Sequence, residues 1–190
     1  NYPINLKKDL SILRNLKVDY VFLPKINDVY SYKRIKKIKL NKSDIILCAK
    51  SRKGHFEGVL DVMDRLTKII CPRKIFMGEK DYQQYHLVKK FLKMKYNVNI
   101  IKCRTIRTAD GVALSSRNLL LGRNDLSIAG MIVKELTKFK KIIKKSNTVS
   151  KNLVLKKEDL LKKFKIKIEY LELRNLKSLK KTNNVRNSKI

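Results

Sequence analysis

Glycine, proline and tryptophan are scarce: the 190 residues include six glycines, three prolines and no tryptophan. Lysine, isoleucine and asparagine are abundant instead, a joint bias that is typical of an AT-rich coding sequence and has no functional meaning by itself. Hydrophobic residues make up 43% of the chain, which is ordinary for a globular protein and too much for a disordered one. The length is sufficient for one sizeable core or two small ones.

Long apolar runs and cysteine clusters are also missing. No apolar run approaches the length of a membrane span, and no signal-peptide pattern opens the sequence, so we expect no membrane partner. Cys48, Cys71 and Cys103 lie far apart, without a metal-ligand spacing. We therefore expect no metal site in this chain, and an odd number of cysteines without a secretory signal indicates reduced thiols in a cytoplasmic protein. The sequence begins at Asn1 rather than Met, so we expect its natural start to lie upstream.

Acidic residues are few, since 16 Asp and Glu stand against 47 Lys and Arg, a formal net charge of +31. Such an excess raises nucleic acid as a partner. The basic residues are mostly Lys spread along the whole chain, however, and the Arg forks and aromatic residues that read bases are thin. We therefore expect weak, salt-sensitive adhesion to polyanions, and keep a basic nucleic-acid-binding protein only as an alternative.

Hydrophobic periodicity predicts an α/β first part. An amphipathic helix is predicted where leucines recur from Leu6 to Leu16. Strands are predicted over residues 18–23, 35–40, 74–77 and 98–103, and further helices over residues 56–70 and from Asp81 onward. Strand, helix, strand in this order is typical of a parallel sheet, which we assign to a domain of residues 1–109.

Beyond Gly111 the pattern changes. A long helix is predicted over residues 125–145, a shorter one over 157–164, and an alternating strand over 166–173. We therefore predict a small α+β C-terminal domain of residues 110–190.

The segment FMGEKDYQQ, residues 76–84, runs from a predicted strand through Gly78 into a helix start. Ligands of parallel sheets bind at the carboxyl ends of strands, where helix N-termini offer amides to anions. Gly78 would allow a tight turn and the close approach of a nucleotide. Lys80 would pair with a phosphate, Asp81 would cap the helix, and Gln84 would face the same opening. The plainer interpretation is a capped helix with solvated charges.

The segment TIRTADGVALSSRN, residues 105–118, contains a predicted turn at Asp110-Gly111. Ser115, Ser116 and Arg117 follow it closely, and clustered donors of this kind bind phosphate. They are equally compatible with two helix-capping serines and a surface charge.

The segment SRKGHFEGV, residues 51–59, carries one of only two histidines in the chain. A lone histidine such as His55 is more often a helix-start or packing residue than a catalyst. The other, His86, lies within a predicted helix and is interpreted as structural.

In this order and spacing, "RKGHFEGV", "FMGEKDYQQ" and "TIRTADGVALSSRN" resemble the characteristic stretches of the pantothenate synthetase (pantoate–β-alanine ligase) family. Weaker agreement extends to "NYPINLKKDLSILRNLKVDYVFLP" and "IEYLELRNL", so the resemblance covers nearly the whole chain. It implies a Rossmann-like fold of the nucleotidyltransferase and class I synthetase type, incomplete in this sequence.

The family uses ATP with Mg²⁺ to condense pantoate with β-alanine, through an enzyme-bound pantoyl adenylate, in coenzyme A precursor synthesis. The resemblance implies this activity and a homodimer. An alternative is another adenylate-forming enzyme of the same superfamily, which would share the phosphate loops but lack the Gln83-Gln84 pair.

The resemblance also implies site residues. Gln84 would bind pantoate, while Arg52 and His55 would support the site. The stretch from Leu114 to Arg117 corresponds to the KMSKS loop of class I aminoacyl-tRNA synthetases. The residues implied to bind ATP are Gly78, Glu79, Lys80, Asp81, Ile106, Leu114, Ser115, Ser116 and Arg117.

Some family features are not found in this sequence. The family carries a first strand with a His-x-Gly-His motif that binds ATP, an early glutamine that holds pantoate, and a closing strand; no histidine pair with that spacing occurs here. We therefore assign no catalytic residue and predict little or no ligase activity for this polypeptide by itself. The whole interpretation requires that Lys80 and Arg117 converge on one triphosphate.

Overall fold

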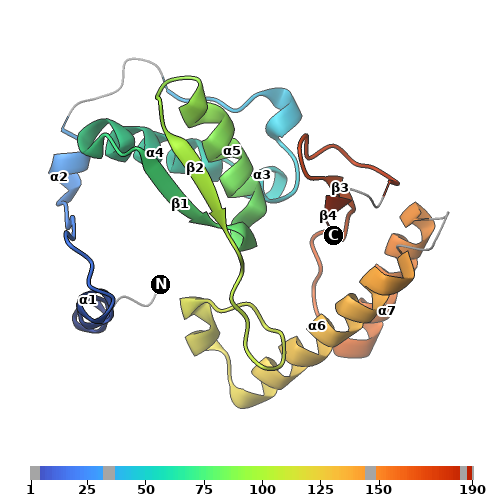
Figure 1. Ribbon diagram of the computed structural model, residues 1–190. Helices are drawn as coiled ribbons and strands as arrows, with labels where there is room; N and C mark the ends of the chain where they lie inside the picture. The colour runs from blue at the N-terminus through green and yellow to red at the C-terminus, as the bar shows by residue number, and fades with distance from the viewer. Residues whose placement is uncertain (1–4, 32–36, 144–148, 185–187, 190) are drawn as a thin grey trace. The chain divides into compact units, whose positions relative to one another are not determined.

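The computed structural model describes residues 5–31, 37–143, 149–184 and 188–189. It divides the chain into two units, Asn1–Thr105 and Ile106–Ile190 (Figure 1). Each unit is described by itself below.

A parallel strand pair lies at the centre of the first unit. Strand β1 (Lys74–Gly78) pairs with β2 (Asn99–Cys103), with Ile75 opposite Ile100 and Gly78 opposite Cys103. Parallel neighbours need a crossover connection, and here it is helix α5 (Tyr82–Lys93), entered through a 3-10 turn, η2 (Glu79–Asp81). The α/β fold with a parallel sheet, predicted from the alternation of strand and helix, is confirmed.

Two helices cover this pair and supply most of the core. Helix α4 (His55–Ile70) packs against α5, and α5 packs against both strands (Figure 1). Each helix turns an apolar face inward because its apolar residues recur every three or four positions. The buried core residues are Ala49, Phe56, Leu60, Tyr85, Leu87, Val88, Leu92, Val98 and Ile100.

The N-terminal part of this unit departs from the prediction. Helix α1 (Leu6–Asn15) forms as expected, and a short helix α2 (Ile26–Val29) follows. The strand predicted over residues 18–23 is wrong: these residues form no strand, and Tyr20 is 92% exposed. A strand needs a neighbour for its backbone groups, and none of the described residues pairs with this run. Of the strand predicted over 35–40, residues 35–36 lie outside the described ones and 37–40 form no strand.

Short elements join α2 to α4. They are a 3-10 turn, η1 (Lys42–Asp44), and a one-turn helix, α3 (Cys48–Ser51). Gly54, in the left-handed conformation at φ 76°, comes just before α4.

The second unit is mainly helical. A 3-10 turn, η3 (Ser116–Leu120), leads to α6 (Arg123–Ile143), which packs against α7 (Val149–Phe164). Helix α7 begins earlier than the predicted residue 157. The core residues are Phe139, Ile143, Val149, Leu153 and Leu173.

The strand predicted over residues 166–173 is wrong. Among the described residues, the strands here are β3 (Arg174–Asn175) and its antiparallel partner β4 (Ser188–Lys189). Other backbone contacts include a bridge from Arg174 to Lys181 and a hydrogen bond from the Thr182 N–H to the Leu173 carbonyl oxygen at 3.2 Å. The apolar alternation has another cause, since Leu171 and Leu173 pack against the helical core without forming a ladder. The alternation showed which side chains turn inward, but among the described residues no strand pairs with this stretch.

Candidate nucleotide site

The segment from Gly78 to Gln84 lies where β1 ends and α5 begins. Because β1 and β2 are parallel and in register up to Gly78 and Cys103, their carboxyl ends meet at one edge. Ligands of open parallel sheets bind at this edge. The structure thus brings Gly78, Glu79, Lys80 and Asp81 together beside the first turn of α5, which carries Gln84.

Gly78 does not make a strained turn. Its backbone angles, φ −66° and ψ 131°, are those of ordinary extended chain, and the chain turns directly after it in η2, so this turn does not require glycine. A β-carbon added to Gly78 would meet no atom within 4 Å. Open space therefore lies beside this α-carbon, and the close approach of a nucleotide stays a prediction.

Charges at this edge are arranged in opposite pairs. Lys80 Nζ lies 3.3 Å from the Asp81 carboxylate, and Lys102 Nζ lies 3.0 Å from Glu79 Oε2. Asp81 stands at the N-cap position of α5, but its side chain makes no capping hydrogen bond, so the predicted cap is wrong. The hydrogen bond to Glu79 raises the pKa of Lys102, which is therefore a cation at neutral pH.

The two adjacent glutamines have different surroundings. Gln84 is half-buried, whereas Gln83 is buried and turned toward the segment that precedes α3. Gln83 Oε1 accepts a hydrogen bond from the Cys48 backbone N–H at 3.1 Å. Its Nε2 donates to the carbonyl oxygen of Ile46 at 2.7 Å and lies 3.4 Å from that of Asp44. Gln83 thereby joins the FMGEKDYQQ segment to the chain that leads into SRKGHFEGV.

The chain bonded by Gln83 contains a strained turn. Ala49 N–H donates to the Ile46 carbonyl oxygen at 2.9 Å, and Leu47 between them has φ 50° and ψ −125°. These are the angles of the first central residue of a type II′ turn, a position normally occupied by glycine. A side chain in so sparsely populated a region costs about 1–3 kcal/mol. Surrounding contacts must therefore hold the turn.

Arg52 and His55 lie together just beyond this turn. Arg52 Nη2 is 3.5 Å from His55 Nδ1, and the histidine ring is tilted against Phe56 with 4.9 Å between ring centroids. His55 is the first residue of α4, as the helix-start interpretation requires. Its supporting role in the site stays a prediction.

In the second unit a hairpin carries the other implied ATP residues. The Leu114 N–H donates to the Ile106 carbonyl oxygen at 2.9 Å, so the structure brings these two residues side by side. The turn predicted at Asp110-Gly111 is confirmed, because Gly111 N–H donates to the Thr108 carbonyl oxygen at 2.9 Å and Gly111 has φ 83°.

The serines that follow behave differently from each other. Ser115 Oγ accepts from the Arg117 N–H at 3.3 Å and caps η3, which confirms the capping interpretation for this residue. Ser116 Oγ is buried and has no hydrogen-bond partner among the described residues. A buried hydroxyl of this kind normally finds a ligand or a water. Arg117 is exposed, and Asn118 Nδ2 donates to the Ala113 carbonyl oxygen at 3.0 Å, closing the loop.

The Asp110-Gly111 turn is seated on α6. A β-carbon on Gly130 would lie 3.1 Å from Asp110 Cβ, and one on Gly111 would lie 3.0 Å from Val133 Cγ1. Asp110 also pairs with Lys134 at 3.5 Å. Because Gly111 and Gly130 have no side chains, the turn approaches α6 closely. This contact holds the start of the loop that ends at Arg117.

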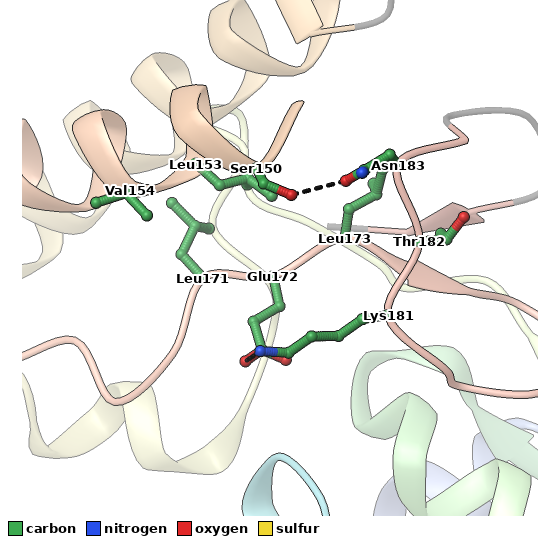
Figure 2. A pocket seen from close by; sticks show the side chains of 9 residues that line it. All are labelled: Ser150, Leu153, Val154, Leu171, Glu172, Leu173, Lys181, Thr182 and Asn183. Atoms are coloured by element: carbon green, nitrogen blue, oxygen red, sulfur yellow. Dashed lines mark hydrogen bonds and ion pairs between the residues drawn. The ribbon is translucent and has the colours of Figure 1, made fainter. Parts of the chain in front are cut away.

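A separate pocket of about 460 Å³ lies in the second unit (Figure 2). It contains none of the implied site residues. Ser150 Oγ donates to Asn183 Oδ1 at 2.7 Å, and Lys181 Nζ lies 3.1 Å from Glu172, which also pairs with Arg174. The lining residues are Ser150, Leu153, Val154, Leu171, Glu172, Leu173, Lys181, Thr182 and Asn183.

Two residues that hold the site were missed by sequence reasoning. Lys102 and Gln83 contact partners that lie far along the chain, so only the charge of Lys102 within an apolar run hinted at a role.

Within the described residues there is no cluster of three metal-ligating side chains and no helix that is long and apolar enough to cross a membrane. The meeting of Lys80 and Arg117, which belong to different units, stays a prediction.

Comparison with known proteins agrees with the motifs. The family model described as pantoate–β-alanine ligase matches residues 1–190. A pantothenate synthetase of Thermosipho africanus is 33% identical over 91% of this chain and 63% of its own length. The bifunctional pantoate ligase/cytidylate kinase of Prochlorococcus marinus subsp. pastoris is 37% identical over 95% of this chain and 36% of its own.

Solved structures show the same likeness. Pantothenate synthetase from Thermus thermophilus superposes with a TM-score of 0.87 at 26% identity, covering 97% of this chain and 67% of that one. The Francisella tularensis pantoate–β-alanine ligase, complexed with β,γ-ATP and β-alanine, gives a TM-score of 0.66 at 41% identity over 70% of this chain and 52% of that one. The chain thus spans about 63% of the T. africanus relative, and it belongs to the pantoate–β-alanine ligase family.

Proposed function

We propose that this chain takes part in the ATP-dependent condensation of pantoate with β-alanine to pantothenate, with Mg²⁺, in the cytoplasm and as a homodimer. The observation that carries the proposal is the segment from Gly78 to Asp81, which lies at the carboxyl end of a parallel strand, has open space beside Gly78, and contains two carboxylates paired with Lys80 and Lys102. The names of the relatives and the ligands of the F. tularensis enzyme support it.

The proposed reaction has two steps. A pantoate carboxylate oxygen attacks the α-phosphorus of ATP, and the bond to the leaving pyrophosphate breaks. The β-alanine amine then attacks the acyl carbon, so that an amide forms, the amine loses a proton and AMP departs with the former carboxylate oxygen. Neither step forms a covalent bond to the protein, so acceleration has to come from positioning and from charge stabilisation.

Each implied residue has a role in this scheme. Lys80 would exchange Asp81 for a phosphate oxygen, while Gln84 would hydrogen-bond pantoate. Ser116 would offer its unpartnered hydroxyl and Arg117 its exposed guanidinium to the leaving pyrophosphate. Glu79 and Asp81 already face lysines, so Mg²⁺ would be held mainly through the phosphates of ATP, as is usual for this ion.

ATP binding is tested by calorimetric titration of the chain at physiological salt. Lys80→Met should weaken binding by about tenfold, the effect of losing one charge-assisted contact of about 1.4 kcal/mol. Lys93→Met, which removes an exposed lysine at the other end of α5, is the matched control for general attraction of anions. No ATP binding, or equal losses in both variants, would contradict the proposal.

The convergence of Lys80 and Arg117 is tested by a double-mutant cycle. If both contact one triphosphate, the losses of ATP affinity in Lys80→Met and Arg117→Met will not add in the double variant. Strict additivity of the two losses would indicate that Lys80 and Arg117 act on ATP binding independently of each other.

Substrate identity is tested by isotope exchange between pyrophosphate and ATP. We expect a slow exchange that depends on pantoate. Exchange supported equally well by unrelated carboxylic acids would favour another adenylate-forming enzyme instead.

A further inference from the structure

One buried side-chain amide holds both sides of a strained turn in the first unit. Gln83, only 7% exposed, accepts from the Cys48 N–H and donates to the Ile46 carbonyl oxygen. Leu47, the residue between these two, has the positive φ of a type II′ turn. The amide therefore bonds the backbone groups that flank the strained position.

We propose that Gln83 is a positioning residue: by holding the turn at Leu47, it places Arg52 and His55 relative to the segment from Gly78 to Gln84. The inference rests on the proposed nucleotide site. The path from Gln83 to the supporting residues is short, because α3 starts at Cys48, ends at Ser51 and leads directly into Arg52.

Only an amide of this length can make the observed contacts. A glutamate would face two carbonyl oxygens with an acceptor that cannot donate when ionised. A methionine fits the same volume but leaves the Cys48 N–H and the Ile46 carbonyl without this partner. Burial hinders water from replacing the lost bonds, so the turn should open or shift.

A second tether holds the same segment at a different point. Lys90 Nζ on α5 lies 2.7 Å from Asp44 Oδ2, at the end of η1 and before the turn. Lys90→Met therefore loosens the segment at Asp44 while leaving the hydrogen bonds of Gln83 to Ile46 and Cys48, which flank the turn, in place. It is the control that separates loss of stability from loss of positioning.

The experiment compares Gln83→Met, Gln83→Glu and Lys90→Met with the wild-type chain. Amide hydrogen exchange of residues 44–52, the midpoint of thermal unfolding and the Kd for ATP are measured for each. The decisive addition is Leu47→Gly, alone and combined with Gln83→Met, because glycine adopts the turn conformation without strain. If Gln83 acts by holding this turn, the glycine will restore what the methionine removes.

We expect Gln83→Met to accelerate exchange of residues 46–50 and to weaken ATP binding by about fivefold to tenfold, the effect of one or two lost buried hydrogen bonds. Gln83→Glu should act in the same direction. In the Leu47→Gly background, adding Gln83→Met should change the amide exchange and the Kd for ATP much less than Gln83→Met does in the wild-type chain. Lys90→Met should lower the unfolding midpoint slightly, because the pair is partly exposed, while its Kd for ATP stays within about twofold of the wild type.

Three results overturn the inference. An unchanged Kd in Gln83→Met, with a midpoint lowered as in Lys90→Met, would make Gln83 a purely structural residue. A loss of ATP affinity in Gln83→Met that Leu47→Gly does not recover would show that Gln83 does not act on ATP binding through this turn. A wild-type chain that fails to bind ATP would overturn the proposed function and the positioning role together, which distinguishes it from the other two results.

Discussion

Lys102 Nζ lies 3.0 Å from Glu79 Oε2, so the first carboxylate after β1 is paired with a cation on the neighbouring strand. The register of the sheet, which sets Lys102 opposite Met77, brings them within reach. Lys102 also lies 5.6 Å from the centre of the Tyr82 ring. This end of the sheet can therefore receive a polyanion without presenting an unpaired Glu79 carboxylate to it.

Removal of this cation should weaken nucleotide binding. We expect Lys102→Met to raise the Kd for ATP by about tenfold, since the Glu79 carboxylate, once it has lost Lys102, would repel nearby phosphates by about 1 kcal/mol or more. The loss should shrink at high salt, because ions screen the repulsion. The double variant with Glu79→Gln should recover most of the affinity; if it binds no better than Lys102→Met, repulsion by Glu79 is not the cause.

Gly78→Ala separates close approach from backbone strain. The angles of Gly78 suit any residue and no atom lies within 4 Å of the added β-carbon, so the unfolding midpoint should stay the same or rise slightly. ATP affinity should nevertheless fall by about tenfold or more, because the methyl group would occupy space assigned to the nucleotide. The two quantities are read by thermal unfolding and calorimetry.

Gly58→Ala is the matched control for that prediction. Gly58 lies within α4 and also has open space at its β-carbon position. The change should stabilise the helix by up to about 1 kcal/mol and leave ATP binding unaltered. Equal affinities of Gly78→Ala and the wild type would exclude a nucleotide at this α-carbon.

Gly111→Ala, unlike Gly78→Ala and Gly58→Ala, should destabilise the protein. Its φ of 83° is unfavourable for alanine, and the added methyl would lie 3.0 Å from Val133 Cγ1. The second unit should lose about 1–2 kcal/mol of stability. Gly122→Ala, whose β-carbon would make an ordinary 3.6 Å contact with Asp125, is the comparison in urea unfolding. Similar midpoints for the two variants would contradict the argument.

Local signals account for what could be predicted from sequence. Strands β1 and β2 and helices α4 and α5 carry their periodicity within themselves, and the Asp110-Gly111 turn carries its own chemistry. The apolar run at residues 18–23 and the alternation at residues 166–173 were typical of strands as well, but strand pairing depends on a neighbour elsewhere in the chain. Propensity without a partner is insufficient for a strand.

The candidate site divides in the same way. Its contiguous residues were found as motifs, whereas the contacts that hold them were not. Gln83 and Cys48 are 35 positions apart, and nothing in the sequence around either residue indicates that the Gln83 side chain will bond the turn that precedes Cys48. The cap assigned to Asp81 is wrong, and the carboxylate lies 3.3 Å from Lys80 Nζ instead.

The last prediction concerns pH and the pairing of α6 with α7. Glu135 accepts hydrogen bonds from Lys156 at 2.9 Å and from Lys163 at 3.1 Å, which lower its pKa from 4.5 to about 2. A pKa that is lower in the folded state contributes stability fully above about pH 4.5 and loses it as the pH falls toward 2. Glu135→Gln should therefore unfold at a lower temperature than the wild type at pH 7, with the difference vanishing near pH 2.

Glu158→Gln is the control, because Glu158 is exposed on α7. Its midpoint should follow that of the wild type throughout the acid range. A gap between the wild type and Glu135→Gln that persists unchanged at pH 2 would mean that the glutamate stabilises the helix pair through packing. A gap that closes with falling pH requires a charged carboxylate, because protonation removes the attraction to both lysines while leaving the side chain in place.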